Sequence, residues 1–413
     1  MGYQQGLSGL AGASNALDVI GNNIANANTV GFKSSTAQFA DVYANSVATS
    51  VNNQIGIGAT LNSVQQEFSQ GSITTTNSAL DVAINGNGFF QMSSNGAITY
   101  SRDGTFQRDK NGYLVNAQGL NLMGYAANGN GVVNTASTVP LQAPTTNIAP
   151  TATTKISAQL NLNSQDTVRA KAFDYTDAST YNFSTAVQTY DSLGGTQQLN
   201  MYFVKTGSGT WETYAGVANA APTDLGTVTF GPNGTISSTA PVGPGVTSSS
   251  TGLFQFSIPT NVSPPPSSQT LTLDLTGTTQ YGGKDGVNNL AQDGYASGTL
   301  TTFSIGTDGK LTGNYSNGQT AVLGQIVLAN FNNPNGLVNL GGNQFAETSA
   351  SGVAQISSPG STNHGTLQGS ALESSNVDLT SQLVNLITAQ RNYQANAQTI
   401  KTQQTVDQTL MNL

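Results

Sequence analysis

The sequence predicts a multidomain protein of mixed α and β class, with a terminal α-helical coiled coil and two mainly-β domains, one inserted in the other. Three observations support this prediction. Apolar residues recur at helical spacing near both ends of the 413-residue chain. Short alternating runs, separated by Gly and Asn, occupy residues 71–370. A segment at 140–154 that is rich in Pro, Thr and Ala has the composition of a linker.

The first predicted element is an amphipathic helix of roughly 24 residues, which is about 36 Å long at 1.5 Å per residue. Its apolar residues recur three, seven, three and four positions apart: Leu7, Leu10, Leu17, Ile20 and Ile24. Several asparagines then precede Val30-Gly31-Phe32-Lys33. Asn28 and Gly31 are residue types that can adopt left-handed backbone geometry. We therefore expect the chain to leave the helix there and Phe32 to anchor it again.

The last predicted element is a second amphipathic helix of roughly 35 residues, or about 50 Å. Its apolar positions follow the same rule: Leu379, Leu383, Leu386, Tyr393, Ala397, Ile400 and Leu410. Asp378 or Ser375 is a suitable residue to cap its first turn.

Both apolar stripes are narrow, as in coiled-coil seams, so the two ends can pair in antiparallel orientation. The positions beside a free coiled-coil seam usually carry Glu and Lys, whereas here they carry Gln, Asn and Ser. Uncharged amides cost less to desolvate than charges do. The pattern therefore suits a helix pair surrounded by further copies of itself. A single helical hairpin in solvent fits the composition comparably well.

The middle of the chain predicts strands and hairpins. The turn pairs Asn111-Gly112, Asn233-Gly234 and Asp308-Gly309 are strong hairpin signals. The predicted domains are an inner helical domain (1–30 with 371–413), a connecting segment (31–71 with 355–370), a β domain (72–147 with 288–354) and an inserted outer β domain (148–287).

Composition excludes several classes of function. The net charge of −8 makes a nucleic-acid backbone an unsuitable partner. The absence of Cys removes thiol catalysis, disulfides and thiolate metal sites. No run approaches the roughly 20 apolar residues of a membrane span, so we expect no membrane insertion. Because no Lys or Arg precedes Lys33, we also expect no cleaved signal peptide.

No pattern predicts an enzyme, a cofactor site or a metal site. GNGFF (86–90) lacks the third glycine of a phosphate loop and reads as a turn that carries Phe89 and Phe90 into a core. The acidic residues around Asp109 lack calcium-loop spacing. His364 is the only histidine, and we expect it to be a loop residue. Trp211 fits a core position better than a ligand platform.

Two terminal motifs carry a resemblance to a known family. GNNIANANTVGFK (21–33) resembles the N-terminal signature of the flagellar axial proteins, which form rod, hook and hook–filament junction. SSNVDLTSQLVNLITAQRNYQANAQTIKT (374–402) is similar to their C-terminal signature. YDSLGGTQQLNMYFVK (190–205), YSNGQTAVLGQIVLANFNNPNGL (315–337) and ALESSNVDLT (371–380) look like hook-type members of the family. The resemblance covers most of the chain and is weak at 206–300.

This resemblance implies a structural subunit that assembles into a curved helical tube, the universal joint between rod and filament of the bacterial flagellum. It implies an extracellular location and export without a cleaved signal peptide. The implied partners are further copies of itself, the distal rod protein, the hook cap protein, the hook–filament junction protein and the flagellar export apparatus. A distal rod protein is the alternative within the family, and a secreted β-rich adhesin or binding module is the alternative outside it.

The polymer interface is expected in the inner coiled coil, within and between subunits. The expected interface residues are Leu7, Leu10, Leu17, Ile20, Ile24, Leu383, Leu386, Tyr393, Ile400 and Leu410. The expected signature turn consists of Asn26, Asn28, Gly31 and Phe32.

Overall fold

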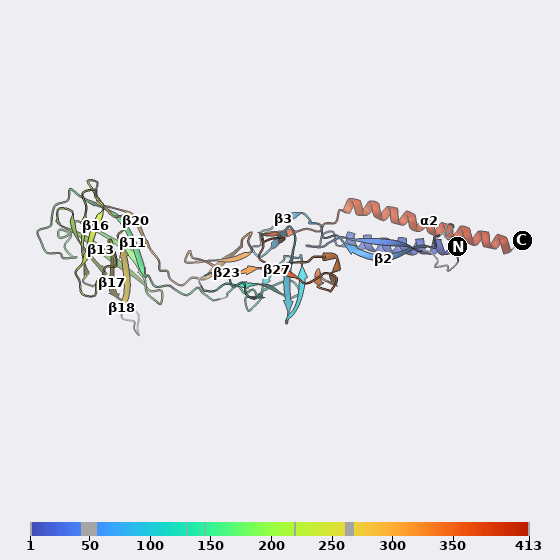
Figure 1. Ribbon diagram of the computed structural model, residues 1–413, viewed down its shortest axis with the longest axis horizontal. Coiled ribbons are helices and arrows are strands. Elements are labelled where there is room, and N and C mark those ends of the chain that lie inside the picture. Colours follow the sequence, from blue (N-terminus) through green and yellow to red (C-terminus); the bar gives the residue numbers. More distant parts are fainter. Residues whose placement is uncertain are drawn as a thin grey trace. The chain divides into compact units, whose positions relative to one another are not determined.

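The computed structural model describes residues 2–42, 56–129, 131–144, 146–218, 220–260 and 268–411. The described chain is mostly β, with one long helix near each end of the chain (Figure 1). It divides into two compact units. Unit 1 contains Met1–Thr145, Thr301–Asn314 and Thr320–Leu413, and unit 2 contains Thr146–Leu300 and Tyr315–Gln319.

The two helices of unit 1 have the lengths that the apolar spacing predicts. Helix α1 (Gly2–Ala25) has 24 residues and helix α2 (Leu379–Met411) has 33. Asp378 caps α2, because its Oδ1 accepts the backbone N–H groups of Thr380 and Ser381 at 2.9 and 3.3 Å. This confirms Asp378 as the capping residue. In the described part of the chain, neither helix is long and apolar enough to cross a membrane.

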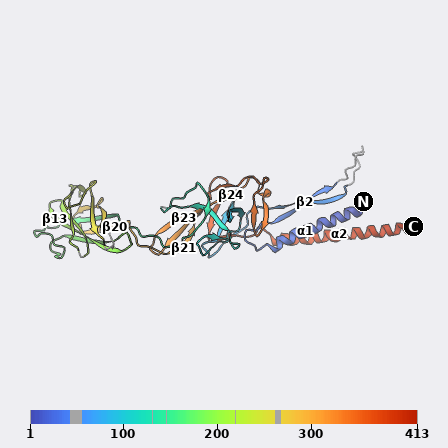
Figure 2. The same cartoon turned by 90° about the horizontal axis from the view of Figure 1, so that it is seen from below.

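The helices lie antiparallel, with the N-terminus of α1 beside the C-terminal half of α2 (Figure 1). Strands β1 (Ser35–Val42) and β2 (Gly58–Gln66) form an antiparallel pair. The residues between these strands, 43–55, include part of the predicted connecting segment and lie outside the described residues. Helix α1 lies between β2 and α2 (Figure 2). Three elements from the two chain ends therefore run along one another.

The β part of unit 1 brings late segments of the chain onto early ones. Its main sheet has the strand order β21-β22-β23-β9-β5-β6-β26-β25, and two small sheets pair β28 with β4 and β29 with β3. Phe90 and Phe89 follow the two glycines of GNGFF, both of which have positive φ, and both aromatic rings are buried. This confirms the predicted turn. Phe90 joins one apolar core, while Phe89 joins a second, smaller core with Tyr100, Phe331 and Phe345.

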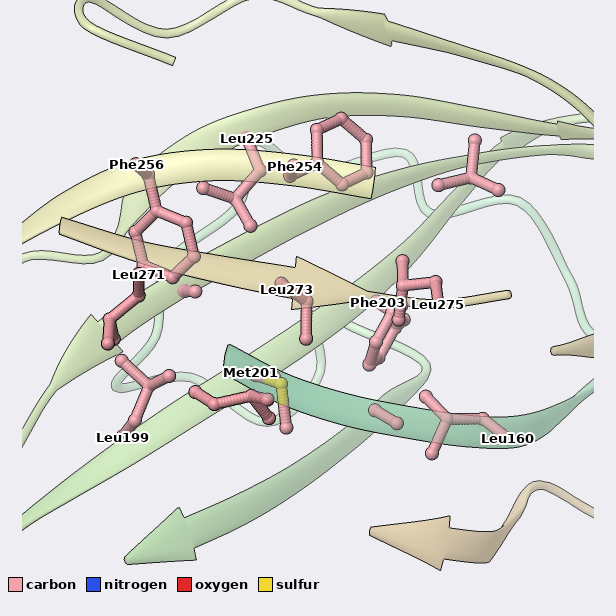
Figure 3. Close-up of a cluster of buried hydrophobic side chains, with 14 of the residues drawn as sticks. Leu160, Leu199, Met201, Phe203, Leu225, Phe254, Phe256, Leu271, Leu273 and Leu275 are labelled. Carbon is pink, nitrogen blue, oxygen red and sulfur yellow. The ribbon is translucent and has the colours of Figure 1, made fainter. Parts of the chain in front are cut away.

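Unit 2 contains two five-stranded sheets with an apolar core. One is an antiparallel meander from β12 to β16. In the other, β11 pairs in parallel with β18 and β19, and in antiparallel with β20. Alternate side chains of β11, β17 and β18, which belong to one sheet, pack against those of β13 in the other sheet (Figure 3). Trp211 is fully buried in this core, which confirms its predicted core position.

Strands β21 (Leu300–Ile305) and β22 (Lys310–Tyr315) each extend one residue past the boundary of unit 1 into unit 2. The remaining strands of unit 1 are β3 (Ile73–Thr75), β4 (Val82–Asn85), β5 (Phe89–Ser94), β6 (Ala97–Ser101), β7 (Gln107–Arg108), β8 (Leu114–Val115), β9 (Asn121–Ala126), β10 (Val139–Pro140), β23 (Thr320–Ile326), β24 (Leu328–Asn330), β25 (Val338–Gly341), β26 (Gln344–Ala346), β27 (Gln355–Ser357), β28 (Thr366–Gly369) and β29 (Ala371–Glu373). A 3₁₀ turn, η1 (Pro334–Gly336), lies between β24 and β25. The strands of unit 2 are β11 (Lys155–Asn163), β12 (Phe183–Tyr190), β13 (Thr196–Gly207), β14 (Thr210–Val217), β15 (Thr223–Phe230), β16 (Ile236–Pro241), β17 (Leu253–Pro259), β18 (Ser268–Asp274), β19 (Thr279–Tyr281) and β20 (Gly286–Gln292).

The hairpin signals in the sequence are confirmed at the three predicted turns. Gly112, Gly234 and Gly309 all have positive φ, at 89°, 75° and 80°. Each lies between two strands that pair with each other: β7 and β8, β15 and β16, and β21 and β22. Glycine adopts this geometry without the steric penalty that a Cβ would add.

We expect Leu160→Ala to lower the free energy of unfolding of unit 2 by about 2–5 kcal/mol, because it leaves a cavity in a fully buried part of the core. Leu193→Ala, at a side chain that is 70% exposed in the same unit, is the matched control. Trp211 is the only tryptophan, so its fluorescence during urea unfolding reports unit 2 alone. Equal midpoints for the two variants would contradict the assigned core.

Candidate assembly site at the terminal helices

The predicted interface residues of α1 are only partly covered in the single chain. Leu7 is 52% exposed. Leu10, Leu17, Ile20 and Ile24 are each partly buried. Apolar surface therefore remains along a helix that already contacts α2 and the β1–β2 pair.

The predicted residues of α2 are more exposed than those of α1. Leu383 is 49% exposed and Leu410 is 66% exposed, and Tyr393 is also exposed. Leu386 and Ile400 are partly buried. Among the described residues of this 33-residue helix, only Ala389 is buried. A helix with so little of its surface covered gains little stability from packing within its own chain.

The contact between α1 and α2 within the chain is formed by small and amide side chains. A Cβ at Gly6 would lie 2.9 Å from Ile400 Cγ1, and a Cβ at Gly9 would lie 2.6 Å from Asn396 Oδ1. Further along, the buried Asn23 donates from Nδ2 to Gln382 Oε1 at 3.4 Å. Of the predicted interface residues, Ile400 lies at this contact, opposite Gly6. The glycines allow the two helices to approach closely.

The signature turn follows α1 and fixes the direction in which the chain leaves it. Asn26 donates from Nδ2 to Asn22 O at 3.0 Å, and its Oδ1 accepts the hydroxyl of Thr29 at 3.1 Å. Gly31 has a φ of 68°, as predicted, and a Cβ there would lie 2.7 Å from the Arg102 carbonyl carbon. Phe32 is partly buried.

The prediction of left-handed geometry at Asn28 is wrong, because Asn28 is not among the residues with positive φ. Its side chain is exposed. The backbone N–H groups of Asn26, Ala27 and Thr29 instead donate to carbonyls three or four residues earlier, which continues right-handed turns as far as Thr29. The reversal therefore falls on Gly31, which has no Cβ to oppose it.

A buried ion cluster lies directly after this turn. Lys33 Nζ is 2.7 Å from Glu373 Oε1, and Arg102 Nη1 is 3.2 Å from Glu373 Oε2. The backbone N–H of Gly71 donates to the same carboxylate at 2.9 Å. All three charged side chains are almost fully buried. The cluster therefore links the exit of α1, strand β6 and the strand that leads into α2.

Both cations of the cluster also donate to backbone carbonyls. Lys33 Nζ donates to Ser69 O at 2.6 Å, and Arg102 Nη2 donates to Gly86 O at 2.9 Å. Burial lowers the pKa of Lys33, and repulsion from Arg102 adds to that shift, while the attraction of Glu373 opposes it. Burial likewise lowers the pKa of Arg102, against the attraction of Glu373. Glu373 is thus the one anion that offsets two buried cations.

Amide side chains extend the same junction. Asn376 Oδ1 accepts the backbone N–H of Ser34 at 2.7 Å, and its Nδ2 donates to Glu67 O at 2.8 Å. Asn343 Nδ2 donates to Val30 O at 2.8 Å. The sequence interpretation missed all of these residues. One feature of the sequence could have pointed to the ion pair. Charged residues are scarce in this chain, yet Lys33 follows the first helix closely and Glu373, of opposite charge, closely precedes the last one.

We expect Glu373→Gln to lower the local opening free energy at this junction by about 3–5 kcal/mol, because it leaves two buried cations uncompensated. Glu347→Gln, at an exposed Glu of the same unit, is the matched control. Hydrogen–deuterium exchange at residues 67–73 reads the opening, and the Trp211 unfolding midpoint should stay unchanged in both variants. Unchanged exchange in Glu373→Gln would contradict the role of the carboxylate.

Lys33 also predicts the sign of a pH dependence. Its pKa is lowered in the folded protein from 10.5, so the unfolded chain binds more protons between the two values. Wild-type unit 1 should therefore gain stability, relative to Lys33→Met, as pH rises through that window toward 10.5. Urea unfolding followed by far-UV circular dichroism measures the difference. A difference that stays flat or falls as pH rises would contradict the prediction.

Family descriptions match this chain along most of its length. They are "Flagella basal body rod protein" at residues 4–33, "Flagellar hook protein FlgE/F/G D1 domain" at 83–159, "Flagellar basal body protein FlaE D2 domain" at 159–295 and "Flagellar basal body rod FlgEFG protein C-terminal" at 368–413. The first match includes most of α1, and the last match includes all of α2. The two helices that contact each other are therefore the segments that the two terminal family descriptions cover.

Individual relatives match over full length. The chain is 44% identical to the flagellar hook protein FlgE of Salmonella typhimurium and 42% identical to that of Escherichia coli K12, with 100% of both chains covered in each comparison. It is 32% identical to FlgE of Brucella suis, covering 99% of this chain and 97% of the relative. The crystal structure of Helicobacter pylori flagellar hook protein FlgE2 has a similar fold, with a TM-score of 0.51 at 15% identity over 73% of this chain and 100% of that one. On this evidence, the chain belongs to the flagellar hook protein FlgE family.

Proposed function

We propose that this protein is the structural subunit of the bacterial flagellar hook. Copies of it would assemble into a curved helical tube that acts as a universal joint and transmits torque from rod to filament. The observation that carries the proposal is the apolar surface left on both terminal helices, in a chain whose full-length relatives are hook proteins. This surface would be costly in an isolated protein and is typical of a protein–protein interface.

The interface that we propose is an inner coiled coil formed by the helices of neighbouring copies. The apolar residues of the sequence-predicted seam, Leu7 and Leu383 among them, would be covered by other subunits as well as by the chain itself. The helix contact inside the chain leaves these two side chains exposed, which supports an arrangement between copies. The positions beside the seam carry amides and not charges, which lowers the free-energy cost of removing water when other subunits cover the helices on several sides.

The domain arrangement follows from the same proposal. Unit 2, Thr146–Leu300 with Tyr315–Gln319, would be an outer domain inserted into the β part of unit 1. The helical ends would form the inner layer of the tube. The expected location is the extracellular flagellum, with export through the flagellar apparatus and without a cleaved signal peptide. The distal rod, hook cap and hook–filament junction proteins are the proposed partners besides the chain itself.

Bending of a rotating tube requires contacts that slide between several arrangements of similar energy. Only 12 Lys and Arg residues and 20 Asp and Glu residues occur in the chain. Of the five ion pairs in the described part of the chain, two belong to the buried cluster around Glu373. A surface with few charges has few ion pairs that would hold one register of neighbouring subunits. We propose no enzymatic activity.

Electron microscopy of the purified full-length protein at high salt tests the proposal. We expect curved tubes. Short straight rods would favour the rod alternative, and a protein that stays monomeric under all polymerising conditions would contradict both.

We further expect Ile387→Glu to raise the protein concentration needed for tube formation by more than about tenfold. Ile387 is 51% exposed in the single chain, so the variant should fold normally, but its new charge would be buried between copies at a cost that exceeds about 1.4 kcal/mol. Leu193→Glu, at an apolar side chain of unit 2 that is also exposed, is the control. Sedimentation of tubes at a series of concentrations measures the effect, and equal thresholds for the two variants would contradict the proposed interface.

A further inference from the structure

An apolar groove runs along α1 between α2 and the β1–β2 pair. It encloses about 460 Å³. Small residues of α1, Gly9, Gly12 and Ala13, line it together with Ala389 of α2 and Phe39 of β1. Gly9 faces Asn396 of α2 and Gly12 faces Phe39 of β1, so small α1 residues form the floor of the groove and α2 and β1 form its walls.

The groove continues toward the C-terminal end of α1. A second hollow of about 160 Å³ shares Ala16 and Phe39 with the first and extends to Ile20 of α1 and Gln382 of α2. From Ser8 to Ile20 the combined groove spans 12 helical steps, or about 18 Å at 1.5 Å per residue. Its length suits two to three turns of a helix, not a small molecule. Grooves of this kind bind helices through apolar residues three, four or seven positions apart.

The same chain carries a matching apolar ridge. We call the exposed residues Leu379, Leu383, Val384 and Ile387 of α2 the α2 ridge. They lie at spacings of four, one and three, over eight helical steps or about 12 Å, which is shorter than the groove. At 3.6 residues per turn, Ile387 lies about 160° around α2 from Ala389, which faces the groove. The ridge therefore points away from the groove of its own chain.

Neither the groove nor the ridge carries a charged residue. None of the residues that line either hollow is Asp, Glu, Lys or Arg. Between Leu379 and Gln390, α2 contains no charged residue. Joining the two surfaces therefore leaves no charge unpaired. The amides on the rim of the groove, such as Gln382, can remain hydrated at its edge.

We propose that the α2 ridge of one copy occupies the groove of a second copy. Two different surfaces of the chain meet in this contact, so it is heterologous, and each copy retains one free groove and one free ridge. A heterologous contact that does not close into a ring generates an open helical polymer. The inference rests on the proposed hook function, and it names which two surfaces of the helical ends meet.

Because the chain contains no Cys, engineered cysteine pairs test this contact without a background. Chains carrying Ala16→Cys are mixed with chains carrying Ile387→Cys, assembled at high salt and oxidised. We expect a disulfide-linked heterodimer, with a yield at least about tenfold above that of Ala16→Cys mixed with Leu340→Cys. Leu340 is a matched control, because it is an exposed apolar residue of β25, away from α2. A second groove variant, Ala59→Cys, and a short bis-maleimide allow for pairs whose geometry does not permit a disulfide.

The outcomes separate this inference from the proposed function. Wild-type tubes with a strong Ala16–Ile387 or Ala59–Ile387 product would support both. Wild-type tubes in which neither pair links above the Leu340 control would overturn the ridge-in-groove contact and leave the hook function standing. In a further variant that carries both Ala16→Cys and Ile387→Cys, a disulfide that forms only within the chain would also overturn it, because the ridge would then reach its own groove. Absence of wild-type tubes would overturn the hook function itself.

Discussion

The carboxylate of Glu373 joins three segments that are far apart in the sequence. It accepts Lys33, which follows α1, Arg102, which follows β6, and the backbone N–H of Gly71. Glu373 itself ends the strand that precedes α2. The positions at which both helices leave the β part of unit 1 therefore depend on one anion. Breaking a buried charge network is far more costly than losing an exposed ion pair. In a chain with few charges, the placement of three of them at this one point gives the junction a strong structural constraint.

The two helices beyond this junction lie against each other, with Gly6 and Gly9 of α1 facing α2. Their contact includes Gly6, Gly9, Ile400 and the amide of Asn396, and among the described residues of α2 only Ala389 is buried. At the positions of close approach, Gly6 and Gly9 have no side chain of their own to bury. The larger apolar residues are therefore available to other molecules. A junction held by a buried ion cluster is thus combined with a helix pair that leaves apolar side chains such as Leu7 and Leu383 exposed.

The sequence predicted the helices, the hairpin turns and the position of Trp211, because each depends on local pattern. The start of α2 was accurate because Asp378 is a capping residue, and the change of direction after α1 was accurate at Gly31 because glycine tolerates positive φ. Asn28 was wrong because the right-handed turns continue through it. The ion cluster could not be predicted, since it pairs Lys33 with a residue 340 positions away and depends on strand pairing that local pattern does not determine. The small residues at the helix contact were also missed, because periodicity weighs large apolar residues and ignores Gly6 and Gly9.

A helical reconstruction of the assembled protein at side-chain resolution would show whether Glu373 fixes the helix pair while other copies cover its apolar surface. We expect the Glu373 carboxylate to keep its contacts with Lys33 and Arg102, and Leu7, Leu383 and Ile387 to be buried against neighbouring subunits. Tubes in which these apolar side chains face solvent, or in which Glu373 is separated from both cations, would contradict this expectation.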